Sequence, residues 1–317
     1  MIVITGPNGN VGTELVRMMA AQTELPFRIA AHSPDKIRRL YGADVQAVKF
    51  DYADRGTWAG VLAGISTLFL LFPLPHPRTA RTWMVPFVEA AKAAGVRHIV
   101  YVSVPGADTL KMVPHYTVER AIEATGVPYT ILRASYFAQN LVRDITTHSV
   151  DIAKYGEIFI PAKGGKTSFI DSRDMASVAI DVFRHPDRHA NRAYVLTGPE
   201  PLDFHQVAAM LTEELGRPVR YADPSMPRFW WRMHRRGVPF DTLFFMTIVY
   251  GLTRGGKNAP MTDTLPRLLG RPATGMRQFI RDYRDRFTPE AADALLAARP
   301  VSPGLFGHRH AAKTHNS

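Results

Sequence analysis

The sequence has 317 residues, 46% of them hydrophobic and 21% charged, which is enough apolar material for one large core or two unequal ones. It contains no cysteine, which excludes disulfides, thiolate metal sites and cysteine nucleophiles and is compatible with a reducing cytoplasm. The formal charge of +11 is uneven, because residues 1–200 carry 22 Lys and Arg against 18 Asp and Glu, whereas residues 201–317 carry 17 against 10.

Neither a membrane span nor a secretory leader is expected. No segment reaches the roughly 18–20 apolar residues that a spanning helix needs. The longest candidate, residues 242–252, is predicted to be a buried helix. Residues 1–4 carry no basic stretch, so no signal peptide is predicted. We therefore expect a cytoplasmic protein without a membrane partner, and the basic C-terminal half is interpreted as a solvated surface that attracts anions.

The first 135 residues alternate short apolar runs with amphipathic helical patterns. Strands are predicted at residues 2–4, 27–31, 45–50, 67–72, 98–102 and 129–132. Helical repeats fall between them, and Gly95 and Gly126 follow two of these repeats as left-handed stops. Strands separated by helices pair through right-handed crossovers, so residues 1–135 are predicted to be a Rossmann-type, doubly wound parallel sheet of an α/β fold.

After Arg133 the pattern becomes mixed. A helix is predicted from Tyr136, and short strands are predicted near residues 157–161, 167–170 and 193–197. Asp203 and Gln206 form a capping-box signal before a helix that Gly216 ends. Residues 136–298 are therefore expected to form a smaller mixed C-terminal substrate lobe that is interleaved with the core.

The end of the chain carries no chemistry that we can assign. Residues 299–317 are rich in Pro and Gly and are expected to be a disordered tail. The tail contains His308, His310 and His315, but no carboxylate lies beside them, so no metal site is predicted.

Three glycines follow the first predicted strand and open the first helix, in the run Thr5-Gly6-Pro7-Asn8-Gly9-Asn10-Val11-Gly12. Glycine permits a tight turn, a close approach of the backbone to a pyrophosphate, and tight packing of helix on strand. The free N–H groups and the dipole at the helix N-terminus favour the negative charge. This context predicts dinucleotide binding by Gly6, Asn8, Gly9, Asn10, Val11 and Gly12.

The end of the second strand selects between NAD and NADP, because an acid there binds a 2′-hydroxyl and a basic residue accommodates a 2′-phosphate. His32, Ser33 and Lys36 follow this strand and position 32 is not acidic, so NADP(H) is predicted over NAD(H). Asp51, at the end of the third strand, is placed to approach the adenine edge. The alternative for Asp51 is a helix cap for the segment at Trp58.

With these features in hand, residues 1–225 resemble the NmrA-like branch of the atypical short-chain dehydrogenases. The resemblance rests on the glycine run and on further motifs at residues 87–96 (FVEAAKAAGV), 126–133 (GVPYTILR), 137–140 (FAQN), 169–174 (FID followed by Asp174) and 194–198 (YxLTG). It implies a Rossmann fold with a small C-terminal substrate lobe and an active cleft between them. By similarity, Phe72, Pro73 and Ser103 would border the nicotinamide.

The chain departs from this resemblance at the catalytic position. Ordinary short-chain dehydrogenases use Tyr-x-x-x-Lys, whereas this chain has Tyr116-x-x-x-Arg120, and arginine does not donate a proton near neutral pH. His115 occupies the position at which isoflavone-type relatives carry a lysine. His115 and Tyr116 are therefore the candidate proton donors, and the alternative for His115 is a structural role at a helix start.

Tyr136, Phe137 and Asn140 follow the sixth strand and are predicted to line a pocket for a small-molecule substrate, although a core position is favoured for Phe137. The leading expectation is an NAD(P)H-dependent oxidoreductase that transfers hydride to a small unsaturated acceptor, such as a quinone or an enone. The rival is a non-catalytic NADP-binding redox sensor that acts through a protein partner. Direct nucleic-acid binding has no motif behind it, and a homodimer stays open.

Overall fold

The computed structural model describes residues 1–22, 24–73, 76–143 and 148–297, and the predicted tail with His308, His310 and His315 lies outside them. The chain forms two compact units. The first comprises the described residues of the ranges 1–137, 170–199 and 261–274, and the second comprises those of 138–169, 200–260 and 275–297. The first crossing between units lies close to the predicted boundary at residue 135, and the chain returns to the first unit twice.

A seven-stranded parallel sheet forms the centre of the first unit. Its order is β10-β6-β5-β4-β1-β2-β3. The strands are β1 (Ile2–Thr5), β2 (Phe27–Ala31), β3 (Ala47–Lys49), β4 (Thr67–Leu70), β5 (His98–Ser103), β6 (Tyr129–Ala134) and β10 (Arg192–Leu196). The predicted Rossmann-type fold is confirmed, and the strand predicted at residues 193–197 joins the same sheet beside β6.

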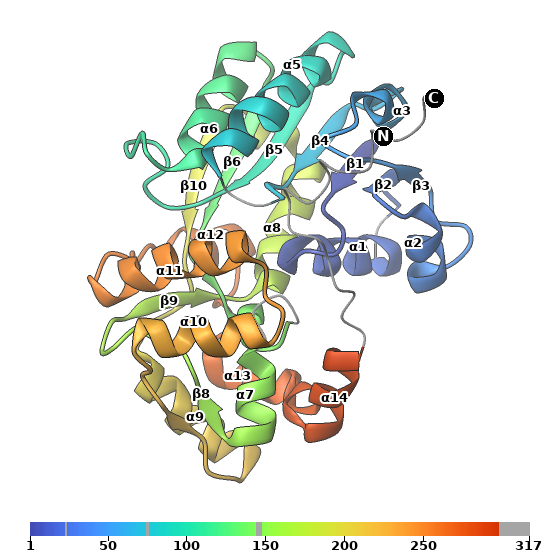
Figure 1. The fold of residues 1–317 in the computed structure, drawn as a ribbon. Coiled ribbons are helices and arrows are strands. Elements are labelled where there is room, and N and C mark those ends of the chain that lie inside the picture. The colour runs from blue at the N-terminus through green and yellow to red at the C-terminus, as the bar shows by residue number, and fades with distance from the viewer. Residues whose placement is uncertain (23, 74–75, 144–147, 298–317) are drawn as a thin grey trace, which may run out of the picture. The chain divides into compact units, whose positions relative to one another are not determined.

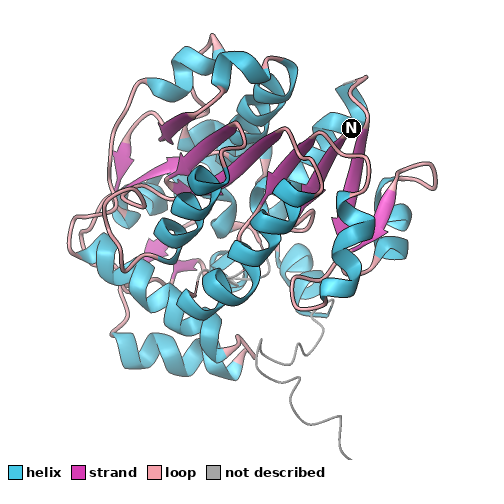
Figure 2. Ribbon diagram, turned by 90° about the horizontal axis from the view of Figure 1, so that it is seen from above, coloured by secondary structure: helices cyan, strands magenta, loops and turns pink. Residues whose placement is uncertain are grey.

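Helices cover both faces of this sheet (Figure 1, Figure 2). Because side chains alternate along a strand, Ile2 and Ile4 pack into one core cluster and Val3 into the other. The first cluster lies under α1 (Asn10–Gln22), α2 (Pro34–Tyr41), α8 (Ser172–Arg184) and α12 (Thr264–Leu269), and the second lies under α3 (Trp58–Leu62), α5 (Val85–Ala93) and α6 (Pro114–Thr125). Shorter turns are η1 (Arg55–Thr57), α4 (Pro77–Thr79), η2 (Ala80–Met84) and η4 (Pro186–His189).

The second unit is a mixed assembly of helices and short strands. Its helices are α7 (His148–Tyr155), α9 (Phe204–Leu215), α10 (Met226–Arg235), α11 (Phe240–Arg254), α13 (Met276–Asp282) and α14 (Pro289–Ala297), with turns η3 (Ala138–Leu141) and η5 (Arg284–Phe287). β11 (Pro201–Leu202) pairs antiparallel with β9 (Thr167–Ile170), and β12 (Arg220–Tyr221) pairs parallel with β8 (Glu157–Ile158). The predicted capping box of α9 is present, because Asp203 and Gln206 exchange hydrogen bonds of 2.8 and 3.0 Å.

The helix predicted from Tyr136 is wrong. Residues Tyr136–Phe137 form the short strand β7, and only a single 3₁₀ turn follows before residue 142. The backbone N–H of Ser135 donates to the carbonyl oxygen of Leu196 at 3.0 Å. This bond continues the β6–β10 pairing beyond the last strand residue, so the chain stays extended where the apolar spacing favoured a helix.

The burial predicted for residues 242–252 is also wrong, although the helix exists as α11. Its side chains at Leu243, Met246 and Tyr250 are buried, whereas those at Phe244 and Ile248 are exposed. A helix that is apolar on all sides is usually buried on all sides. Here the unit covers only one side of it. No helix among the described residues has the length and apolar character needed to cross a membrane.

Candidate nucleotide-binding site

The glycine loop follows β1 at the point where the strand order reverses. β1 pairs with β2 on one side and with β4 on the other, and ligands of open α/β sheets bind at such points. The Thr5 hydroxyl donates to the carbonyl oxygen of Phe69 at 3.0 Å and accepts from the N–H of Leu71 at 2.9 Å. Thr5 therefore ties the ends of β1 and β4 together and fixes where the loop begins.

Close packing explains the glycines of this loop. Gly6 adopts a left-handed φ of +62°, which side chains disfavour, and its carbonyl oxygen accepts from the N–H of Gly9 at 3.0 Å. A Cβ on Gly12 would lie 2.1 Å from the Gly6 carbonyl oxygen. Gly12 thus allows α1 to start against the loop, while Gly6, Asn8 and Gly9 remain exposed. The result is an exposed backbone surface at the N-terminus of a helix, which suits an anion.

The residues predicted to contact the adenosine end of a nucleotide gather after β2 and β3. The Nε2 atom of His32 lies 3.7 Å from Oδ2 of Asp51, and both side chains are exposed. Ser33 is the N-cap residue of α2, but its hydroxyl makes no capping hydrogen bond. Lys36 is exposed in the first turn of α2.

Asp51 does not cap the segment at Trp58. Its carboxylate accepts from the N–H of Ala53 at 2.9 Å, and its backbone carbonyl accepts from the indole N–H of Trp58 at 3.2 Å. Asp54 caps the preceding turn η1, where its carboxylate accepts from the N–H of Gly56, and α3 itself begins after Thr57 without a side-chain cap. The alternative interpretation of Asp51 is therefore wrong, and its second carboxylate oxygen faces His32.

His115 lies in a buried aromatic environment on α6. Its Nδ1 atom is 2.7 Å from the Tyr101 hydroxyl, and its ring centroid is 4.9 Å from that of Phe72. Burial lowers the pKa of His115 to about 3, so the imidazole is neutral at physiological pH. The structure therefore brings His115 next to Phe72, which the resemblance had placed at the nicotinamide.

Tyr116 belongs to a different face of α6. Its ring packs under the Arg120 guanidinium, whose carbon is 5.6 Å from the ring centroid. Arg120 in turn binds Glu123 at 2.7 Å. Because Tyr116 and Arg120 are four residues apart, they share one side of the helix and do not point at Tyr101 with His115.

A buried polar network at the ends of β5 and β6 was missed by the sequence analysis. The Ser103 hydroxyl donates to Oε1 of Glu119 at 2.6 Å. Arg133 binds both oxygens of Glu119, at 3.1 and 2.7 Å, and Oδ2 of Asp108 at 3.1 Å. Glu119 is fully buried, so its negative charge depends on this arginine.

The two-residue spacing along β5 and the four-residue spacing along α6 bring these side chains together. Tyr101 and Ser103 are two residues apart on one face of β5, and His115 and Glu119 are four apart on the facing side of α6. Ser103 is also the direct neighbour of Arg133 across the β5–β6 pair. The only sequence signal was that Ser103 and Arg133 each directly follow a predicted strand.

The residues predicted to line a substrate pocket fall in both units. Tyr136 is buried in the first unit, and Phe137 packs against a core cluster there, as its alternative interpretation held. Asn140 lies in the turn η3 of the second unit. Among the described residues, no group of three His, Asp or Glu side chains could hold a metal ion.

Together, the sheet order and the glycine loop define a Rossmann-type α/β protein. The sequence model of the NmrA-like family matches residues 1–230. The chain belongs to the NmrA-like family.

Similar proteins cover almost the whole chain. NAD(P)H azoreductase of Xenophilus azovorans is 31% identical over 90% of this chain and 99% of its own length. The NADPH complex of an NADPH-dependent quinone oxidoreductase from Escherichia coli has a TM-score of 0.75 at 25% identity and covers 90% of this chain and 100% of that one. Triphenylmethane reductase of Citrobacter sp. in complex with NADP(H) has a TM-score of 0.76 at 24% identity, covering 89% and 99%, and supports the fold alone.

Proposed function

We propose that this protein is an NAD(P)H-dependent oxidoreductase that transfers hydride to a small unsaturated acceptor, with NADPH preferred and a quinone as the favoured acceptor class. The observation that carries the proposal is the exposed backbone of Gly6 and Gly9 at the start of α1, beside the point where the strand order reverses. The azoreductase and quinone oxidoreductase relatives, whose names include NAD(P)H and NADPH, support the same cofactor class.

The chain's own residues fit a dinucleotide along this edge of the sheet. The first N–H groups of α1, after Gly9, would bind the pyrophosphate. A Cβ on Gly6 would lie 3.0 Å from the Leu71 side chain and one on Gly9 would lie 3.3 Å from the Gly6 carbonyl oxygen, so glycine keeps the loop tightly packed. The Ser33 hydroxyl and the Lys36 ammonium group would bind a 2′-phosphate. Among the described residues Lys36 has no ion-pair partner, whereas His32 faces the Asp51 carboxylate, so we expect Lys36 to carry most of the NADPH preference.

A bound nicotinamide would supply the hydride, and the fate of the proton favours quinones. An imidazole whose pKa is lowered to about 3 is neutral at neutral pH, so the imidazolium that would act as the general acid is not present. A quinone that accepts hydride becomes a phenolate-type anion, which solvent can protonate. His115 would then act as a positioning residue for Phe72 through ring contact, and Glu119 would hold the Ser103 hydroxyl in a fixed direction.

Cofactor binding and hydride transfer can be tested separately. Calorimetry should give tighter binding of NADPH than of NADH, and Lys36→Glu or His32→Asp should remove or reverse that difference. Gly9→Val should abolish binding, because its side chain would occupy the place of the pyrophosphate. Gly164→Val is the matched control, since a Cβ there meets nothing within 4 Å. Wild-type affinity in Gly9→Val would contradict the loop assignment.

Stopped-flow oxidation of bound NADPH by a panel of quinones and enones tests the chemistry. We expect quinones to react faster than they do with free NADPH, and enones to react slowly because they need a proton from the protein. Equal affinity for NADH and NADPH would contradict the cofactor preference, and faster turnover of enones would contradict the acceptor class.

The rival function, a non-catalytic NADP sensor, has one observation in its favour. The two candidate proton donors are a buried neutral His115 and a Tyr116 that packs under Arg120. A sensor would bind NADP tightly, oxidise no NADPH with any acceptor, and bind a protein partner whose affinity depends on the cofactor. Linkage requires that partner to change the cofactor affinity by the same factor.

A further inference from the structure

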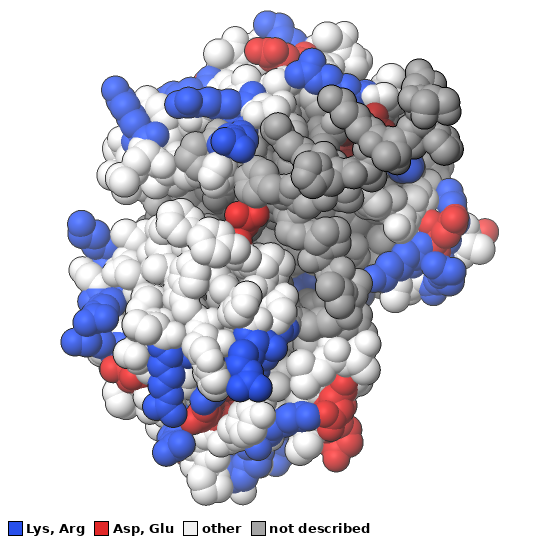
Figure 3. Space-filling model, viewed as in Figure 1, with Lys and Arg blue, Asp and Glu red and all other residues white. Residues whose placement is uncertain are grey.

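The α11 helix carries an exposed apolar stripe. Phe240, Phe244, Ile248 and Leu252 are 42–67% exposed, and their spacing of four residues puts them along one side of the helix. The opposite side is buried in the second unit. Figure 3 shows a broad area without charged side chains where α11 lies in Figure 1, with Lys and Arg side chains beyond its edges. An apolar surface of this kind marks a contact with another molecule or with a membrane.

The neighbouring helix α10 adds an exposed tryptophan and basic side chains. Trp231 is 60% exposed, and the Arg235 guanidinium carbon lies 4.9 Å from its ring centroid. α10 packs on α11 through Trp230, whose ring is 5.3 Å from that of Phe240 and whose indole N–H donates to Thr247 at 2.7 Å. The two helices therefore form a hairpin, residues 226–254, with apolar and cationic side chains on its open surface.

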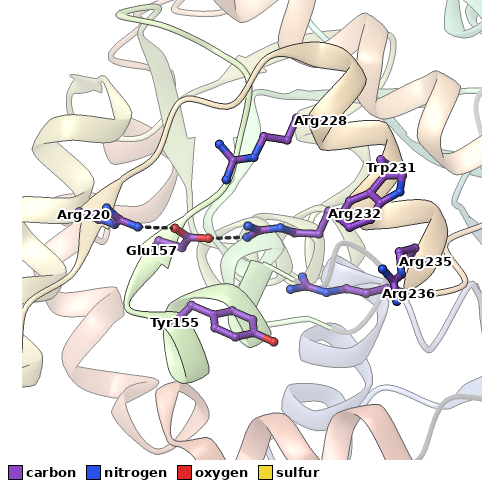
Figure 4. A pocket seen from close by; sticks show the side chains of 8 residues that line it. All are labelled: Tyr155, Glu157, Arg220, Arg228, Trp231, Arg232, Arg235 and Arg236. Carbon is purple, nitrogen blue, oxygen red and sulfur yellow. Dashed lines mark hydrogen bonds and ion pairs between the residues drawn. The ribbon is translucent and has the colours of Figure 1, made fainter.

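A basic pocket of about 520 Å³ borders this hairpin (Figure 4). Five arginines line it, and the acids that face them are Glu157 in the pocket wall and the buried Asp151. The cluster therefore keeps an excess of about three positive charges at neutral pH. The arginines are Arg220, Arg228, Arg232, Arg235 and Arg236.

Asp151 and Glu157 form ion pairs with only some of the five arginines. Arg236 binds both oxygens of Asp151 at 2.7 Å, and Arg232 binds Asp151 at 2.8 Å and also contacts Glu157. Among the described residues, Arg228 and Arg235 have no ion-pair partner. Both side chains are exposed: Arg235 lies over Trp231, and the Arg228 guanidinium carbon lies 5.9 Å from the ring centroid of Phe159.

We infer that the α10–α11 hairpin binds the surface of a lipid bilayer that contains anionic lipid. The apolar stripe and Trp231 would enter the boundary between headgroups and acyl chains, while Arg228 and Arg235 bind lipid phosphates. The sequence analysis expected no membrane partner because no segment can span a bilayer. A pair of helices that lies on the surface needs no spanning segment.

The positive charge of the arginine cluster favours a bilayer over a second copy of this chain as the molecule that binds the hairpin. In a symmetric contact between two copies, the same surface meets itself, so each copy would bring the same excess of positive charge to the contact. An anionic bilayer neutralises the arginines and also covers the apolar stripe. The inference does not depend on the proposed reductase activity, because it concerns residues of the second unit alone.

Sedimentation with vesicles tests the inference. We expect the protein to pellet with vesicles made of equal parts phosphatidylglycerol and phosphatidylcholine, and not with phosphatidylcholine alone. High salt should weaken this binding, because it screens the phosphate contacts. Lipids brominated in the acyl chains should quench tryptophan fluorescence, and Trp231→Phe should remove most of the quenching.

Paired variants separate the two contributions. Arg228→Gln and Arg235→Gln should each weaken binding about fivefold, as expected for one basic residue at an anionic surface. The double change Phe244→Ser and Ile248→Ser should weaken it on the order of tenfold or more. Arg39→Gln and Leu40→Ser are matched controls on the exposed surface of α2, and they should leave binding unchanged. Circular dichroism checks that every variant is folded.

Three results would overturn the inference. The first is equal sedimentation with neutral and anionic vesicles. The second is unchanged vesicle binding in the α11 serine variant, or an equal loss in the α2 controls. The third is a dimer in lipid-free solution that the α11 serine variant converts to a monomer, which would make the stripe an interface between two copies.

Discussion

Each unit of the molecule contains a buried histidine that is hydrogen-bonded to a buried tyrosine. In the first unit, Nδ1 of His115 lies 2.7 Å from the Tyr101 hydroxyl, and in the second unit Nε2 of His148 lies 2.5 Å from the Tyr250 hydroxyl. Burial lowers the pKa of both imidazoles to about 3, and for His148 the nearby Arg236 adds to the effect. Of the two histidines, only His115 contacts Phe72, which belongs to the proposed nucleotide site.

The pair formed by His148 shows that a buried histidine of this kind can be structural, and this bears on the role of His115. The sequence analysis singled it out as a proton donor because it replaces a lysine of related proteins. His148 has the same chemistry and the same partner, yet it belongs to the second unit and to no predicted site. A buried Tyr–His pair thus occurs twice among the described residues, and the contact with Phe72 is what distinguishes His115.

Removing Asp151 should lower the free energy of unfolding more than any other proposed substitution, and it acts in the second unit, near His148. Asp151 lies three residues after His148 on α7 and is bound by Arg232 and Arg236. Asp151→Ala would leave both guanidinium groups without their shared acid, so the free energy of unfolding should fall by about 4 kcal/mol. Urea unfolding measures this. Glu213→Ala, at an exposed ion pair with Arg277, should lower the free energy of unfolding far less, because solvent screens the pair.

The pH dependence of the free energy of unfolding should show whether the His115 and His148 pairs are equivalent. The folded-state pKa of both histidines is lower than the unfolded value, so the unfolded state binds more protons between about pH 6.5 and pH 3. The stabilisation is fully present above that window and is lost as the pH falls through it. Near pH 5, each histidine should lower the free energy of unfolding by about 2 kcal/mol relative to neutral pH.

Non-titrating variants isolate the contribution of each histidine. His115→Gln and His148→Gln should each reduce the loss of stability between neutral pH and about pH 5 by a similar amount. Urea unfolding at several pH values measures the slope. A slope that changes in only one of the two variants would contradict the view that the two pairs are equivalent.

The same two histidines should differ moderately in their effect on catalysis. If His115 only positions Phe72, His115→Ala should lower quinone turnover by less than about tenfold, whereas loss of a general acid costs roughly 10²–10⁴-fold. His148→Ala should leave turnover per folded molecule unchanged. Stopped-flow rates across pH, normalised to folded protein, make the measurement. A loss of more than a hundredfold in His115→Ala, with a changed pH profile, would restore its role as the acid.

Tyr116→Phe should have the smallest effect. The change keeps the ring that packs under Arg120 and removes only the hydroxyl. Turnover should stay within about twofold, and the free energy of unfolding within about 0.5 kcal/mol. A large fall in turnover alone would show that Tyr116 donates a proton after a rearrangement of its side chain.

Local signals in the sequence predicted most of the fold. Alternating apolar runs located the strands of the first unit, and the glycines after α5 and α6 adopt the predicted left-handed stops. The Asp203–Gln206 capping box was also predicted, because both partners lie within one helical turn. Each of these features depends on residues that are close in the chain.

Features that depend on distant partners were not predicted. Glu119 binds Ser103 and Arg133, which lie 16 and 14 residues away and meet only when α6 packs on the sheet. The extended chain at Tyr136 depends on the bond from Ser135 to Leu196, and the exposed side of α11 depends on which elements cover it. Apolar spacing alone holds none of this information.

The late position of β10 in the chain has a consequence for synthesis on the ribosome. β6 ends at Ala134, but the strand that pairs with its free edge begins only at Arg192. At 5–20 residues per second, the nascent chain waits roughly 3–12 s before that strand is made. During this time β6 is an open edge to which another nascent chain can pair. Chaperones that shield such edges would act on this protein before its translation is complete.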